Sequence, residues 1–80
     1  MVYPIDPAMR EPKGDHNRRL ALGMDIEAFA SEAGLTRDQV YAYEMTSPDH
    51  DFDLAVAQNY GIALERLEAH PPSSQVVRNI

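Results

Sequence analysis

The chain has 80 residues, which suits one small domain with a single hydrophobic core. Its composition, 44% hydrophobic and 25% charged, is ordinary for a folded protein, and the absence of Cys excludes disulfides, thiolate metal sites and a Cys nucleophile. The net charge of −6 is unevenly distributed: residues 1–19 hold four basic side chains against three acidic ones, and residues 20–80 hold three against ten. This acidic body argues against strong non-specific binding to nucleic acid, because phosphate binding depends mainly on Lys and Arg.

The sequence shows no sign of membrane insertion or export. No apolar run approaches the roughly 20 residues that span a bilayer, and the N-terminus lacks the basic start and apolar stretch of a signal peptide. We therefore expect a cytoplasmic protein, a compartment that also fits the lack of Cys.

The two ends of the chain differ in composition from its middle. Residues 1–14 are expected to form a flexible N-terminal arm, because helix formation is interrupted there by Pro4, Pro7, Pro12 and Gly14. Residues 71–80 begin with Pro-Pro-Ser-Ser and are expected to form a flexible tail, or alternatively an adhesive segment through Val76, Val77 and Ile80. The domain itself would occupy residues 15–70.

Capping residues predict the first two helices of this domain. A helix over 15–22 would start at Asp15 and end before a glycine. A second helix over 25–33 would start at Asp25 and end at Gly34.

A third helix is predicted over 36–45. Thr36 and Gln39 have the spacing of a capping box, and Leu35 with Val40 has the spacing of a hydrophobic staple. This start signal follows the turn at Gly34 directly, so the second and third helices would be joined by a short turn.

The last helical segment runs from about Phe52 to Ala69, after a loop of turn-forming residues. We expect Gly61 to split it into two tightly joined helices, with one longer helix as the alternative. The fold class is therefore all-α, with four to five helices. The predicted core consists of Leu20, Phe29, Ala30, Leu35, Val40, Tyr43, Leu54, Ala57, Tyr60, Leu64 and Leu67.

The segment 26–44 carries a helix-turn-helix pattern. Ala30, Gly34 and Val40 supply the small residue, the turn glycine and the β-branched anchor that this motif requires. On these residues the chain resembles the Cro/C1-type (XRE) helix-turn-helix family of small bacterial and phage regulators. It is more weakly similar to short XRE-like proteins of rhizobia, a setting in which small antiactivators of quorum sensing occur.

The resemblance implies a recognition surface on the third helix. Arg37 would be placed to read guanine and Gln39 to read adenine, although we favour the capping-box role for Gln39. The family usually has a polar DNA contact where this chain has Ile26. The whole candidate surface comprises Arg37, Asp38, Gln39, Tyr41, Ala42 and Met45, with Ile26 and Arg18 adjoining it.

The same resemblance implies a structural role for Arg19 and Glu44, whose positions often form an ion pair in the family. Metal sites are not expected: the acidic loop lacks the Gly and distal Glu of a calcium site, and the histidines lack zinc spacing. We expect no catalytic activity and no cofactor.

Two functions remain open from the sequence. The chain could be a transcriptional modulator that binds a protein with a basic patch, as an antiactivator would, and the acidic body, Ile26, Asp38 and Ala42 favour this reading. Alternatively, it could be a sequence-specific DNA-binding repressor that acts as a dimer, which the family resemblance favours. A continuous positive face around Arg37 and Arg18 would indicate DNA, whereas isolated arginines among carboxylates would indicate a protein partner.

Overall fold

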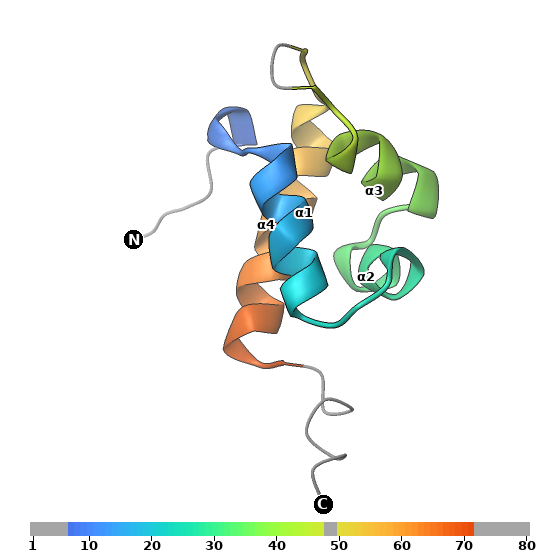
Figure 1. The fold of residues 1–80 in the computed structure, drawn as a ribbon, viewed down its shortest axis with the longest axis vertical. Coiled ribbons are helices and arrows are strands. Elements are labelled where there is room, and N and C mark those ends of the chain that lie inside the picture. Colours follow the sequence, from blue (N-terminus) through green and yellow to red (C-terminus); the bar gives the residue numbers. More distant parts are fainter. Residues whose placement is uncertain (1–6, 48–49, 72–80) are drawn as a thin grey trace, which may run out of the picture.

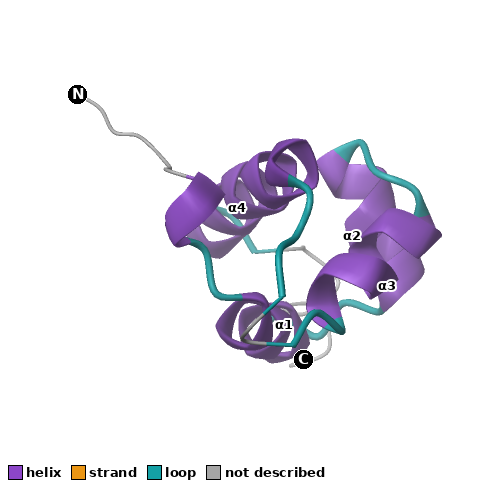
Figure 2. Ribbon diagram, turned by 90° about the horizontal axis from the view of Figure 1, so that it is seen from above, coloured by secondary structure: helices purple, strands orange, loops and turns teal. Residues whose placement is uncertain are grey.

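The computed structural model describes residues 7–47 and 50–71. Over these residues the chain is all-helical and has no strand: a 3-10 helix η1 (Pro7–Met9) precedes α1 (Pro12–Ala21), α2 (Ile26–Ala33), α3 (Arg37–Glu44) and α4 (Leu54–Ala69) (Figure 1). Viewed from above, α2 and α3 lie together on one side of the molecule, with α1 and α4 on the other (Figure 2). The expected all-α class is confirmed. The predicted roles of residues 1–6 and of the tail beyond Pro71 fall outside the described residues.

Helix α1 starts earlier than the sequence analysis predicted. It begins at Pro12, and Asp15 lies within its first turn as a buried residue rather than as the N-cap. Proline is well tolerated at the first helical position, where its missing N–H has no intrahelical partner to lose. Part of the segment expected to be an arm, namely η1 and the first turn of α1, is therefore helical.

Helices α2 and α3 have the caps that the sequence predicts. The carboxylate of Asp25 accepts a hydrogen bond from the N–H of Ala28 at 2.8 Å. Gly34 ends α2 in the left-handed region with φ of 70°, where a side chain would be strained. Thr36 and Gln39 form the reciprocal capping box, with distances of 2.9 and 3.1 Å.

Helix α4 continues without a break through Gly61, so the expected division into two helices is wrong. The carboxylate of Asp53 caps its start by accepting from the N–H groups of Ala55 and Val56. Gly61 is needed for close approach rather than for a turn, because the guanidinium of Arg10 lies directly over it.

The core lies where all four α-helices meet. Phe29, Val40, Tyr60 and Leu64 are completely buried, and the Phe29 and Tyr60 rings lie 4.5 Å apart. Two predicted core residues, Leu20 and Leu54, are instead about half exposed, at 54% and 51%. Leu35 is only partly buried against the core.

The error at Leu20 has a simple cause. The buried side of α1 consists of Asp15, Arg19 and, at the end of the helix, Leu22, which are spaced four and three residues apart. Because two of these residues are charged, apolar periodicity does not identify this side. Leu20 lies about a third of a turn away from the middle of this side and faces outwards.

Candidate functional site

The candidate recognition residues of α3 do not share one face. Arg37, Tyr41 and Met45 recur every fourth residue and lie along one side. The carbonyl oxygen of Gln39 is occupied by the capping box. A separate hollow of about 300 Å³ towards the start of α4 is lined by residues that include Gln39 and Ala42. Asp38 projects from the helix with its side chain 97% exposed.

A groove of about 560 Å³ runs between α1 and α3, and we call it the α1–α3 groove. One wall consists of Arg37, Tyr41 and Met45, and the opposite wall consists of His16 and Leu20, which are one helical turn apart. Its end is closed by the α1–α2 connection and the start of α2, through Gly23, Met24, Asp25 and Ile26.

The walls of this groove carry several accessible apolar side chains. Leu20, Tyr41 and Met45 are each about half exposed, and they account for three of the six large hydrophobic side chains exposed in the described part of the chain. Partly buried Met24 and Ile26 continue this surface. Exposed apolar side chains that gather in one place mark interaction sites more often than scattered ones do. Sequence reasoning missed the contribution of Leu20, because it placed that residue in the core.

The floor of the groove contains the ion pair between Arg19 and Glu44. Arg19 donates from Nε to Oε2 of Glu44 at 2.7 Å and from Nη2 to Oε1 at 3.0 Å. Its Nη1 donates to the carbonyl oxygen of Met24 at 2.8 Å, and the hydroxyl of Tyr60 donates to Glu44. The ion pair that the resemblance implied is therefore present, and it joins α1, α3 and α4.

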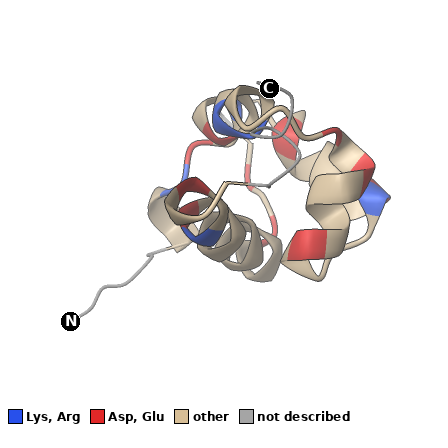
Figure 3. Cartoon of the chain, turned by 90° about the horizontal axis from the view of Figure 1, so that it is seen from below, with Lys and Arg blue, Asp and Glu red and all other residues tan. Residues whose placement is uncertain are grey.

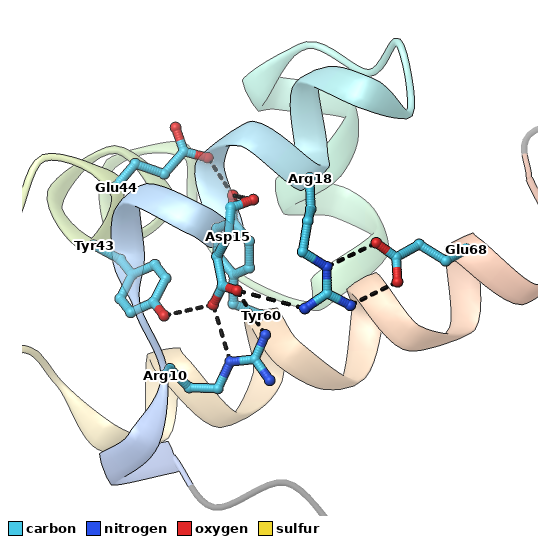
Figure 4. Close-up of polar contacts among 7 residues, drawn as sticks. All are labelled: Arg10, Asp15, Arg18, Tyr43, Glu44, Tyr60 and Glu68. Carbon is cyan, nitrogen blue, oxygen red and sulfur yellow. Dashed lines mark hydrogen bonds and ion pairs between the residues drawn. The ribbon is translucent and has the colours of Figure 1, made fainter.

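A second buried carboxylate, that of Asp15, holds the N-terminal segment on the helices (Figure 4). Arg10 donates to it through Nε at 2.9 Å and Nη2 at 2.7 Å, and the hydroxyl of Tyr43 donates at 2.7 Å. Tyr60 also donates to the backbone carbonyl of Asp15 at 3.3 Å. No buried side-chain nitrogen or oxygen in the described segments lacks a partner, so this network is fully satisfied.

Burial raises the pKa of both Tyr43 and Tyr60, because their phenolate forms would lose hydration inside the core. The hydrogen bonds that they donate to Asp15 and Glu44, respectively, raise the pKa further. Both hydroxyls are therefore held protonated as donors to carboxylates. The network stabilises the fold and provides no activated nucleophile.

Arg18 lies away from the α1–α3 groove, contrary to the expectation that it adjoins the recognition surface. It donates from Nε and Nη2 to the two oxygens of Glu68 on α4, at 2.8 and 2.6 Å (Figure 4). The hydrogen bond with Glu68 raises the pKa of Arg18, and that with Arg18 lowers the pKa of Glu68. Arg18 thus connects α1 to α4.

Arg37 does lie on the groove, but it stands among carboxylates. Its Nε is 3.5 Å from Oε2 of Glu27, and its Nη1 is 3.9 Å from Oδ1 of Asp38. Apart from the consecutive Arg18 and Arg19, basic positions lie apart from one another in Figure 3 and form no continuous stripe. The arrangement around Arg37 and Arg18 is therefore that of isolated arginines in an acidic surrounding.

Every arginine in the described segments has a carboxylate partner. The pairs are Arg10–Asp15, Arg18–Glu68, Arg19–Glu44, Arg37–Glu27 and Arg66–Glu32.

Other kinds of site receive no support from the described residues. They contain no group of three or more His, Asp or Glu side chains that could hold a metal ion. None of their helices combines the length and apolar character needed to cross a membrane. No family model matches the chain, and no curated protein or solved structure shows significant similarity to it.

Proposed function

We propose that this chain is a small helix-turn-helix transcriptional regulator that acts mainly by binding a protein partner, in the manner of an antiactivator. In this proposal α2 and α3 are the motif's two helices, and the outward face of α3 is the recognition surface. The left-handed Gly34 makes the turn, and buried Ala30 and Val40 allow the close approach of the helices.

The pairing of every described arginine with a carboxylate is the observation that carries this proposal. A protein that binds DNA gains most of its affinity from cations that neutralise phosphates. Here the cation on α3, Arg37, would have to leave Glu27 and approach DNA beside Asp38. The net charge of −6 adds repulsion over a longer range, most of all at low salt.

The exposed side chains of α3 are of the kind that contact another protein. Tyr and Met are enriched in protein interfaces, because they bury much apolar area and adapt to irregular contacts. Tyr41 and Met45 present such side chains, and Ile26 extends the apolar area where the related family has a polar DNA contact. A partner with a basic patch would be steered towards the acidic body.

The test is a titration of the purified protein with DNA from its own upstream region across salt concentrations, with Arg37→Ala and Tyr41→Ala variants alongside. We expect weak binding without sequence preference, unchanged by Arg37→Ala. Tight binding to one sequence that weakens steeply with salt and is lost in Arg37→Ala would overturn the proposal in favour of a repressor.

A further inference from the structure

The geometry points to one class of occupant for the α1–α3 groove: an amphipathic helix of the partner, about two turns long, with basic residues at the end that faces α2. This inference rests on the proposed protein-binding function and adds the kind of segment that is bound. The apolar face of that helix would contact Leu20, Tyr41 and Met45.

The shape of the groove fits a helix. Its walls are two helices whose lining residues recur at one-turn intervals, with Tyr41 and Met45 as the apolar side chains on α3 and Leu20 on α1, and grooves between helices of this kind can receive an amphipathic helix. The wall on α3 extends from Arg37 to Met45, which at 1.5 Å per residue is about 12 Å. That length accommodates about two turns of a bound helix, with anchors at positions i, i+4 and i+7.

The floor of the groove offers nothing for a polar ligand to bind. Arg19 and Glu44 are 6% and 5% exposed, and their polar atoms already bond to each other, to Met24 and to Tyr60. A nucleotide base or a peptide backbone would find no unpartnered polar side-chain atom of Arg19 or Glu44 there. The apolar face of a helix needs no hydrogen-bond partner, so it gives up no hydrogen bonds to water when it docks over this floor.

Charge sets the direction of the bound helix. The end of the groove next to α2 carries Arg37 against three carboxylates, those of Asp25, Glu27 and Asp38. Lys or Arg at that end of the partner helix would meet a net negative surface, whereas acidic residues would be repelled. Binding should therefore weaken as salt is raised.

The probe is a fluorescent amphipathic peptide of Leu and Lys, about 15 residues long so that it can form a helix. A scrambled peptide of the same composition controls for net charge, and a Leu–Glu peptide with the same apolar pattern controls for the sign of the charge. Anisotropy gives the dissociation constants, and amide NMR shifts of the full chain locate the contact. Thermal unfolding checks that each variant is folded.

We expect binding of the Leu–Lys helix alone, with shifts confined to the groove. Tyr41→Ala and Leu20→Ala should each weaken it about tenfold, as truncations at an interface centre do. Ile62→Ala is the matched control, because Ile62 on α4 is similarly exposed at 49% but lies outside the groove. It should change affinity less than about twofold.

Four results would overturn the inference. These are no binding of the Leu–Lys helix, equal binding of the scrambled peptide, an equal effect of Ile62→Ala, and a concentration-dependent dimer that Met45→Lys dissociates, which would make a second copy the occupant. Failure of the peptide to bind would overturn only the inference that the partner segment is a helix. Tight Arg37-dependent binding to DNA would overturn the proposed protein-binding function itself.

Discussion

The guanidinium of Arg10 lies over Gly61 on α4, so that a Cβ at Gly61 would be 3.0 Å from its Cζ and Nη1 atoms. Arg10 cannot easily move aside, because Asp15 holds it through two hydrogen bonds. A side chain from outside the helix therefore restricts the space for a Cβ at this glycine in the middle of α4.

Replacing Gly61 by Ala should lower the free energy of unfolding in the wild-type chain, although alanine favours helices over glycine by about 1 kcal/mol. In an Arg10→Ala background the same change should raise the free energy of unfolding by about 0.5 to 1 kcal/mol. Urea denaturation of the four proteins in this double-mutant cycle measures the difference. Equal effects of Gly61→Ala in both backgrounds would show that the contact with Arg10 does not determine how the alanine changes stability.

Removing Glu44 should be among the most destabilising single changes in this chain. Glu44→Ala leaves Arg19 charged and buried without its partner, a change that costs about 3 to 5 kcal/mol. Glu68→Ala is the control, because the Arg18–Glu68 pair is partly exposed and should contribute less than about 1 kcal/mol. Thermal and urea unfolding compare the two variants, and similar losses would contradict the central role of the buried pair.

Stability should fall at alkaline pH. The pKa of Tyr43 and of Tyr60 is raised in the folded protein, whereas both ionise near pH 10 when unfolded. Their contribution is therefore complete below about pH 10 and is lost as the pH rises above it, by up to about 1.4 kcal/mol per pH unit for each tyrosine. Urea titrations from pH 8 to about 11 should show a shallower decline in Tyr60→Phe than in the wild type. An identical dependence of stability on pH in the two proteins would refute the assignment of this decline to Tyr60.

The side of α1 that faces the core can be tested with two neighbouring leucines. Leu22→Ala removes a buried side chain and should cost about 2 to 3 kcal/mol, or more than 8 °C in melting temperature for a chain of this size. Leu20→Ala should change stability by less than about 0.5 kcal/mol, because that side chain faces the groove. A larger loss of stability in Leu20→Ala than in Leu22→Ala would mean that α1 is rotated about its own axis relative to this structure.

The sequence predicts those elements whose ends depend on local chemistry. The starts of α2 and α3 follow from Asp25 and from the capping box of Thr36 and Gln39, because these bonds connect residues only three positions apart. Gly34 likewise ends α2 where expected. Such signals are complete within a few residues, so no knowledge of distant partners is needed.

What escaped prediction depends on distant partners. The sequence assigns Asp15 as a cap because its bond to Tyr43, 28 residues away, is not visible in a local pattern. Gly61 was assigned as a break because the side chain that lies over it comes from 51 residues earlier. The candidate groove is built from α1, the start of α2 and α3, and the sequence predicts Ile26 and the part on α3 but not the wall on α1.

The buried polar network also bears on how the chain folds. Its hydrogen bonds join Asp15 to Tyr43, Arg19 to Glu44 and Tyr60 to Glu44, contacts separated by 28, 25 and 16 residues. A partly assembled form that lacked α3 would hold the charge of Arg19 without Glu44, and a form that lacked α4 would lose the hydrogen bond from Tyr60 to Glu44, so such forms are disfavoured. We therefore expect unfolding to be a single cooperative transition, in which no subset of the helices persists alone.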